Sequence, residues 1–574
     1  MRTKRLIPWA LCAAVVLPTG AFADVSFDIK GIDGELEKNV AIYLAAIPAS
    51  DRRLTFRFQS RVKDEVEKAM QALGYFAPVI KYSIEDEKAK DDATVVLDIT
   101  PGEPVRIKQV DIQLTGDALH DKAFAKLLAT APKVGDVLNQ GQYDSLKSAI
   151  QSLAVRRGYF DADYTLSRLE VAPGLNEAFI RLYFNSGMRY HFGDVYYHNS
   201  QINEDRLNTM LTFKEGDPYL VSDLGAFNQA LSNTGWFSSV LVEAGVDDLR
   251  DGRVPISVNL EPAARNQFET GIGYSTDTGP RVKIGWKKPW FNSRGHSLNT
   301  DLYISKPKQT LESTYKIPLE DVQREYYQVQ VGLENLDNND TQSLEWTSSI
   351  SRHWKFDTGW QRAVYVRWLY SDYTQGNVSD ISNLVLPGVN FSRVRSRGGA
   401  MPSWGDKQSI TFEAGDPALL SDISIFRVVG QTAWIRSLND NNRFFTRLNA
   451  GGIFTSDFER VPPSLRFFAG GDNSIRGYSY ESISPLDSSG QLEGGAYLTT
   501  GTLEYNYRLT GNWWGAVFTD AGDAWTSSTP EWKTSVGVGI RWESPVGPIR
   551  FDIAHGFENT SDDFMIHFSL GPEL

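Results

Sequence analysis

The chain has 574 residues, of which 41% are apolar, 22% charged and 12% aromatic, and its formal net charge is −13. This length predicts several domains, and the acidic balance argues against nucleic-acid binding, which needs a basic surface. Beyond the first 23 residues no apolar run reaches the roughly 18 residues of a transmembrane helix, which excludes a helical membrane bundle. A soluble multidomain protein and a membrane β-barrel both stay open, because alternating strands escape hydropathy averages.

Residues 1–23 have the layout of a secretory signal peptide. Three basic residues lie in the first five positions, an apolar stretch follows, and an Ala-Phe-Ala cleavage site ends at Ala23. We expect cleavage before Asp24, and we disfavour a membrane anchor because the apolar stretch is short and contains a proline. The single cysteine, Cys12, would leave with the peptide, which excludes a disulfide framework and thiolate metal sites. The net charge of the exported chain would be −16.

The next part of the chain contains three similar modules. A glycine-aromatic-Phe triplet begins at Gly74, Gly158 and Gly235, which are 84 and 77 residues apart. Each triplet follows apolar residues at helical spacings of three and four, and its glycine lies where a helix C-cap is expected. With an opening strand in each copy, the pattern predicts strand, helices, strand, strand, which is an α+β module; a single α+β domain with coincidental triplets is the alternative. We place the modules at residues 24–103, 104–187 and 188–264.

Residues 265–574 have a different pattern. They hold 13 of the 15 tryptophans, and period-two alternation replaces the helical spacing. Near residues 497–508 one parity is apolar or aromatic while the other carries Glu504 and Asn506, which fits a membrane barrel better than a sandwich with an apolar interior. The 310 residues provide about 16 antiparallel strands of roughly 10 residues. We expect Asn335–Asp340 to be a mostly polar loop.

The sharpest local signal is a segment at residues 467–485 that is too polar and glycine-rich for a membrane strand. It carries Arg476, and Glu504 and Asp520 lie on the strands that follow. If the face that carries Asp520 is the lumen, an arginine from an inward-folded loop can pair with one or both carboxylates and fix the loop inside the barrel. The alternative is an ordinary extracellular loop with a solvated arginine.

Two motifs of this region match signatures of a known family. The loop motif is Ile475, Arg476, Gly477 and Tyr478, and the strand motif is Phe518, Asp520 and Gly522. They resemble the (V/I)-R-G-(F/Y) and F-x-D-x-G signatures of the POTRA-plus-barrel outer-membrane assembly and secretion superfamily. Over residues 24–574 the chain is similar to the outer-membrane subunits of translocation and assembly modules. Three POTRA-like modules distinguish this branch from the essential barrel-assembly subunit, which usually has five, and from two-partner secretion transporters, which usually have two and a plug helix.

The resemblance implies a fold, a location and a function. It implies a Gram-negative outer-membrane β-barrel with residues 24–264 in the periplasm, which assists the insertion and translocation of autotransporters and related barrel proteins. Its partners would be a TamB-like protein that is anchored in the inner membrane and spans the periplasm, unfolded outer-membrane protein substrates and outer-membrane lipids. No cofactor, no metal and no enzyme activity are expected, and no nucleotide-binding motif is found.

In this family the first and last barrel strands pair poorly and open sideways into the bilayer. Here those strands would be residues 267–275 and 564–574. Glycine weakens a strand and proline cannot donate a ladder hydrogen bond, so a weak lateral seam is physically reasonable. The expected seam residues are Gly271, Gly273, Phe568, Leu570 and Gly571.

Three other functions are compatible with an outer-membrane barrel: a phospholipase, a passive pore and a secretion transporter. His567 and Ser569 have the spacing of an outer-membrane phospholipase, but Phe568 occupies the apolar parity, so both should point inward, and no G-x-S-x-G or H-E-x-x-H motif is found. A passive pore would leave about 240 periplasmic residues without a role, since porins need only short periplasmic turns. A two-partner-type secretion transporter for a dedicated exoprotein is the alternative, and the third module and missing plug helix count against it.

Overall fold

The computed structural model describes residues 24–52, 54–85, 92–399, 401–526, 529–544, 547–558 and 564–570. The expected signal peptide with Cys12 and the expected seam residue Gly571 lie outside these residues. Among the described residues, no helix combines the length and the apolar character needed to cross a membrane.

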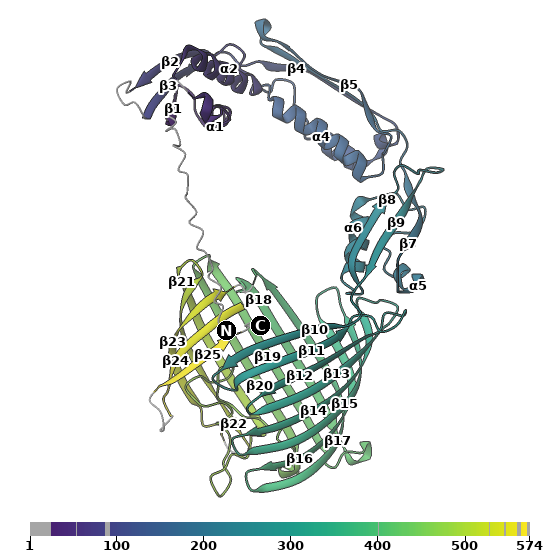
Figure 1. The fold of residues 1–574 in the computed structure, drawn as a ribbon, viewed down its shortest axis with the longest axis vertical. Helices are drawn as coiled ribbons and strands as arrows, with labels where there is room; N and C mark the ends of the chain where they lie inside the picture. The colour runs from purple at the N-terminus through teal and green to yellow at the C-terminus, as the bar shows by residue number, and fades with distance from the viewer. Residues whose placement is uncertain are drawn as a thin grey trace, which may run out of the picture. The chain divides into compact units, whose positions relative to one another are not determined.

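Three α+β modules come first along the chain (Figure 1). Their elements are β1 (Asp24–Lys30), α1 (Gly34–Ala45), α2 (Phe56–Ala72), β2 (Val79–Glu85) and β3 (Asp92–Thr100); β4 (Arg106–Thr115), α3 (Lys122–Leu128), α4 (Gln140–Arg156), β5 (Asp163–Ala172) and β6 (Glu177–Asn185); and β7 (His191–His198), α5 (Glu204–Asn208), α6 (Val221–Ser232), β8 (Phe237–Ala244) and β9 (Arg253–Pro262). In each sheet the last strand lies in the middle, in the orders β1-β3-β2, β4-β6-β5 and β7-β9-β8. The predicted sequence of strand, helices, strand, strand is confirmed.

The spacing of apolar residues explains these modules. In the first one, α2 buries Val62, Val66 and Met70 against Val95 and Leu97 of the central strand. A spacing of four places these helix residues on one face, and alternation places the strand residues on the other side of the same core. The triplet glycines have positive φ angles of +90°, +80° and +70°, as expected where the chain leaves a helix in the left-handed conformation.

The second half of the described chain is a closed barrel of 16 sequential antiparallel strands. The strands are β10 (Gln267–Ser275), β11 (Gly279–Lys288), β12 (Ser297–Ser305), β13 (Lys308–Pro318), β14 (Glu325–Asn338), β15 (Thr341–Lys355), β16 (Gln361–Gln375), β17 (Val378–Arg397), β18 (Trp404–Gly415), β19 (Ile425–Asn439), β20 (Asn442–Thr455), β21 (Tyr497–Thr510), β22 (Trp513–Trp525), β23 (Lys533–Ser544), β24 (Gly547–Gly556) and β25 (Met565–Leu570). The predicted fold class, POTRA-like modules followed by an all-β barrel, is confirmed.

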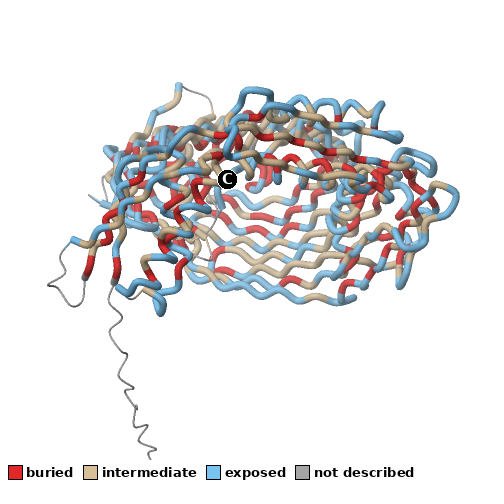
Figure 2. The backbone as a smooth tube through the Cα atoms, turned by 90° about the horizontal axis from the view of Figure 1, so that it is seen from above, coloured by how far each residue is buried: buried red, intermediate tan, exposed pale blue. Residues whose placement is uncertain are grey.

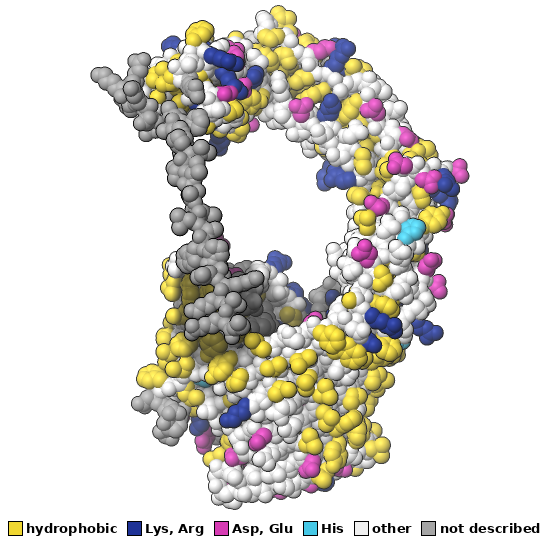
Figure 3. Space-filling view, viewed as in Figure 1, with side chains coloured by type: hydrophobic (Ala, Val, Ile, Leu, Met, Phe, Trp, Pro, Cys, Tyr) yellow, Lys and Arg dark blue, Asp and Glu magenta, His cyan; other side chains and the backbone are white. Residues whose placement is uncertain are grey.

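The two faces of the barrel wall follow the predicted parity. On β21, Leu503 is exposed, whereas Glu504 and Asn506 are buried. Figure 2 shows exposed and buried positions alternating along the wall, and Figure 3 shows hydrophobic side chains gathered on its outer face. The apolar side chains therefore face the bilayer and the polar ones face the lumen.

The expected polar loop at Asn335–Asp340 is wrong for most of its length. Strand β14 continues to Asn338, which is the register partner of Thr341 on β15, so only Asn339 and Asp340 form the turn. Asn339 has a φ of 51°, the left-handed conformation that asparagine tolerates. Barrel strands longer than the membrane is thick keep their ladder hydrogen bonds in water, where polar side chains are suitable.

The segment between β20 and β21, residues 456–496, folds into the barrel; we call it the inward loop. Its residues Val461, Leu465, Phe467 and Ile475 belong to one buried apolar cluster with wall residues such as Leu369. Within the loop, isolated antiparallel β-bridges pair Phe467 with Gly495 and Ala469 with Ile483. A polar lumen therefore contains a small apolar core of its own, built by the loop and the wall together.

The third module contacts the periplasmic turns of the barrel. Trp236 Nε1 donates a buried 3.0 Å hydrogen bond to the carbonyl oxygen of Gly295, in the β11–β12 turn. Arg206 Nη1 donates to the carbonyl oxygen of Leu319 (3.0 Å), in the β13–β14 turn. Gly295 has a φ of +77°, and a Cβ atom there would overlap the indole of Trp236. These contacts make a close-packed joint that tolerates only glycine at this position.

Candidate functional site

The structure brings three of the sequence-predicted residues together inside the barrel. The guanidinium group of Arg476, from the inward loop, donates from Nε to Asp520 Oδ2 (2.8 Å) and from Nη2 to Asp520 Oδ1 (3.0 Å), which is a bidentate pair. The Arg476 backbone N–H donates to the same carboxylate (3.1 Å), and Nη1 donates to Glu504 (2.8 Å). The side chains of Arg476 and Asp520 are 5% and 0% exposed. Asp520 therefore faces the lumen, as the pairing required.

Two residues that were not singled out from the sequence complete this cluster. Arg541 on β23 donates to Glu504 (2.9 Å from Nη2) and to Asp552 on β24 (2.5 Å from Nη1). Asp552 also accepts from Arg476 Nη1 at 3.2 Å. We call Arg476, Glu504, Asp520, Arg541 and Asp552 the charge anchor. Every carboxylate in it has a cationic partner, as buried charges require.

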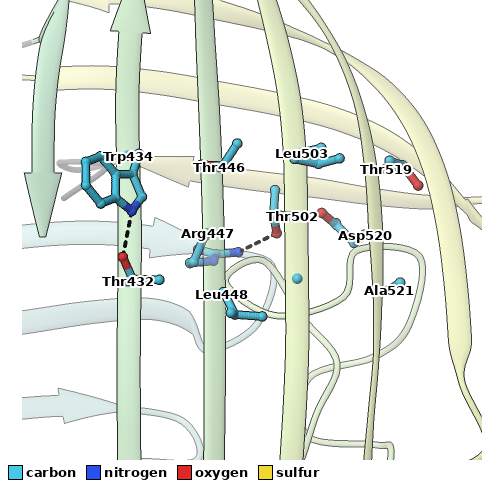
Figure 4. A pocket seen from close by; sticks show the side chains of 11 residues that line it. Thr432, Trp434, Thr446, Arg447, Leu448, Thr502, Leu503, Thr519, Asp520 and Ala521 are labelled. Atoms are coloured by element: carbon cyan, nitrogen blue, oxygen red, sulfur yellow. Dashed lines mark hydrogen bonds between the residues drawn. The ribbon is translucent and has the colours of Figure 1, made fainter. Parts of the chain in front are cut away.

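A pocket in the wall lies beside the charge anchor and is lined by residues of β19 to β22 (Figure 4). Arg447 lines this pocket together with Asp520. Arg447 donates to Thr502 (3.4 Å) and to Asn473 of the inward loop (3.3 Å). It adds a third positive charge close to the three carboxylates of the anchor, which brings the buried site near charge balance.

The other two residues of the loop motif have separate structural roles. Gly477 has a φ of +91°, and a Cβ atom there would lie within 3.1 Å of the backbone of β24. Only glycine lets the loop approach the wall so closely. The Tyr478 hydroxyl donates to Glu558 (2.6 Å), just beyond the end of β24. The motif therefore presses the loop against the last strands of the barrel.

The first and last strands of the barrel pair with each other over a short length. Among the described residues, β10 and β25 share one register pair, Ser275 with Ser569, whereas β10 pairs with β11 along its whole length. Gly271 and Gly273 have partners on β11 only.

The described last-strand residues expected at the seam do lie there. The Phe568 ring lies 6.0 Å from the Tyr274 ring, on the outer face, and the carbonyl oxygen of Leu570 accepts from Arg281 (3.1 Å). His567 points inward, as its parity predicted, and is 4% exposed.

A closed barrel with an anchored inward loop and preceding α+β modules defines a β-barrel protein of the outer membrane, with the modules in the periplasm. The family model described as "Omp85 superfamily domain" matches residues 265–573. The models described as "POTRA domain TamA domain 1" and "Surface antigen variable number repeat" match residues 26–101 and 190–263. The chain belongs to the Omp85 superfamily.

Two curated relatives share the name outer membrane protein assembly factor BamA. The protein from Nitratidesulfovibrio vulgaris is 25% identical over 60% of this chain and 45% of its own length. The protein from Neisseria meningitidis is 19% identical over 88% of this chain and 71% of its own length. This chain thus spans under half the length of the first of them. A crystal structure of BamA from Haemophilus ducreyi lacking POTRA domains 1–3 has the same fold, with a TM-score of 0.71 at 17% identity over 81% of this chain and 99% of that one.

Proposed function

We propose that this chain is a TamA-type insertion and translocation factor, which assists the assembly of autotransporters and related barrel proteins through its lateral seam and performs no enzymatic reaction. The observation that carries the proposal is the contrast between two joints. The inward loop is fixed to the wall by a bidentate, fully buried ion pair, whereas the first and last strands share one register pair among the described residues. A barrel with a firm internal loop and a weak seam is suited to opening sideways.

An open seam offers a template for an incoming strand. The edge of β10 would expose unpaired N–H and C=O groups, to which an unfolded outer-membrane protein adds a strand by β-augmentation. The substrate enters the bilayer with its backbone paired, as the absence of water there demands. The driving force is the folding of the substrate itself, helped by local thinning of the outer-membrane lipids.

The choice of the TamA branch rests on the periplasmic part. Three modules precede the barrel in the described part of the chain, and the first contains the match to the model described as TamA domain 1. We propose a TamB-like partner, anchored in the inner membrane, that docks on a free edge of one of these small sheets. The outer strands β1 and β2 of the first module are edges of this kind.

Quantitative outer-membrane proteomics tests the proposal. Cells that lack the protein are compared with cells that carry the wild type, Arg476→Ala or Arg460→Ala, the last being a half-exposed arginine of the same loop. We expect a few large barrel-anchored proteins to be lost, with general porins intact, from the cells that lack the protein and from the cells that carry Arg476→Ala. Loss of a single secreted protein from the medium would favour the two-partner-type transporter, and an unchanged proteome in both compartments would overturn the proposal.

A further inference from the structure

One end of the seam is closed by side chains as well as by the single register pair of the two edge strands. The third module precedes β10 in the periplasm, so β10 ends on the outer side at Ser275. Directly after it, the Thr276 backbone N–H donates to the carbonyl oxygen of Phe568 (3.2 Å), and the Phe568 N–H donates to the Thr276 hydroxyl (3.1 Å). This corner is where the two edge strands meet.

Asp472 of the inward loop contacts both edges at this corner. Its Oδ1 atom accepts from the Thr276 hydroxyl (2.9 Å) on the first-strand side and lies 2.7 Å from His567 Nδ1 on β25. Its backbone N–H donates to Asp277 (2.9 Å), in the β10–β11 turn. The Asp472 side chain is 5% exposed. One buried carboxylate therefore bonds to the first edge and to the last edge.

The hydrogen bonds of His567 fix its tautomer. The Gly477 backbone N–H donates to His567 Nε2 (2.8 Å), so Nε2 carries a lone pair and no proton. The proton of the neutral ring is then on Nδ1 and is donated to Asp472. The ligand atoms of Asp277, Asp472 and His567 lie within 4.8 Å of one another, a spacing that would suit a metal ion. A metal on Nδ1 would leave both ring nitrogens without a proton, so the group is better suited to hydrogen bonding.

Asp277 completes the corner. The second carboxylate oxygen of Asp472 is buried and has no hydrogen-bond partner among the described residues. Burial, and then the negative charge of Asp472, raise the pKa of Asp277 to about 7. When it is protonated, the Asp277 carboxyl becomes a hydrogen-bond donor beside the Asp472 carboxylate.

We propose that Asp472 is a positioning residue that clasps the seam, by tying both edge strands to the inward loop. The inference deepens the proposed function, because it names the residue that holds the same seam shut. The proposal also connects the seam to the charge anchor. Arg476 follows Asp472 by four positions in the chain, so the charge anchor holds the clasp in place, and the seam opens when the loop moves.

A single buried thiol reports on this corner. Ser275 is 6% exposed, and the only natural cysteine is Cys12 in the expected signal peptide, so Ser275→Cys provides one reporter. The labelling rate with a membrane-impermeant maleimide follows the open fraction when the closed state dominates. We expect Asp472→Ala to raise this rate about tenfold, the value of one hydrogen bond to a charged group. Asp472→Asn, which keeps an acceptor for Thr276 and His567, should stay close to the wild-type rate.

Two further variants control the experiment. Asp487→Ala removes an aspartate of the same loop that bonds to Ser489 and Asn377, away from the seam, and should leave the rate unchanged. Thr276→Val removes only the bridging hydroxyl and should raise the rate, and heat-dependent gel mobility shows that each barrel is folded. An unchanged rate in both Asp472→Ala and Thr276→Val would overturn the clasp. Faster labelling beside an unaltered proteome in the Arg476→Ala strain would support the clasp and overturn the proposed function.

Discussion

The guanidinium carbon of Arg476 lies 3.3 Å from the centre of the Phe518 ring, on the same inward face as Asp520. The ring offers a flat surface for the planar cation, and the carboxylate two residues later accepts two of its hydrogen bonds. The F-x-D spacing of the strand motif follows from this geometry, because residues two apart on a strand share one face.

We predict that Arg476→Lys releases the inward loop as thoroughly as Arg476→Ala. A lysine ammonium is a point charge and cannot bond both oxygens of Asp520 while it reaches Glu504 and stacks on Phe518. The measurement is protease cleavage of the loop at the surface of intact cells, with Arg460→Lys as the control. A loop that stays protected in Arg476→Lys would show that charge alone holds it.

Arg541→Met is expected to destabilise the barrel by about 3–5 kcal/mol, because it leaves Asp552 and Glu504 buried with fewer cationic partners. Urea unfolding from lipid vesicles measures the free energy. The control is Arg550→Met, at the register partner of Arg541 on β24 and outside the charge anchor, which should cost about 1 kcal/mol or less. Equal losses in the two variants would contradict a special role for Arg541.

The closed corner is expected to weaken as the pH rises through about 7. The pKa of Asp277 is raised to about 7 in the closed state, from an ordinary value of 3.8. The closed state therefore binds the proton more tightly than the open state, and this stabilisation of the closed state is lost when the proton leaves. The groups that face Asp277 are Asp472, His567 and Tyr480.

The Ser275→Cys labelling rate measures this dependence. Thiol reactivity itself rises with pH, so the rate is divided by that of the same reporter with Asp277→Asn, whose amide stays a donor at every pH. The ratio should grow between about pH 6 and about pH 8. A constant ratio would show that Asp277 carries no proton in the closed corner.

Gly295→Ala is expected to loosen the joint between the third module and the barrel by about 1–3 kcal/mol, because the added methyl group overlaps the Trp236 indole. Hydrogen exchange of the third module measures the effect. Gly279→Ala is a matched control, since its φ of +69° imposes similar backbone strain while its Cβ would point into open space. Equal effects in the two variants would assign the loss to strain and not to the joint.

Periodicity was sufficient to predict the architecture. The spacing before Gly74, Gly158 and Gly235 predicts the three helices and their ends, and the parity of Glu504 predicts the inward face of β21, whereas the inward position of Asp520 was one of two alternatives. These features depend on neighbours within one element, which a sequence displays directly.

Apart from the pairing of Arg476 with Asp520 and Glu504, which was one of two alternatives, contacts between distant elements could not be predicted from periodicity. Arg541 and Asp552 have inward parity, but their meeting depends on the register of β23 with β24, which alternation alone does not fix. Asp472 lies in a loop without periodicity, and its partners Thr276 and His567 are almost 200 residues earlier and 95 residues later. The continuation of β14 through Asn338 was missed because polar residues were interpreted as a loop, although a strand above the membrane surface is free to be polar.

The joint at Trp236 makes the two edges of the seam mechanically unequal. Its hydrogen bonds reach the turns at Gly295 and Leu319, which connect β11 to β12 and β13 to β14 on the first-strand side. A pull on the third module would therefore reach the strands on the first-strand side through these turns, whereas it would reach β25 around the barrel wall or through Asp472. In the proposed function, the edge that would receive a new strand is therefore the braced one, and the opposite edge is the one expected to yield.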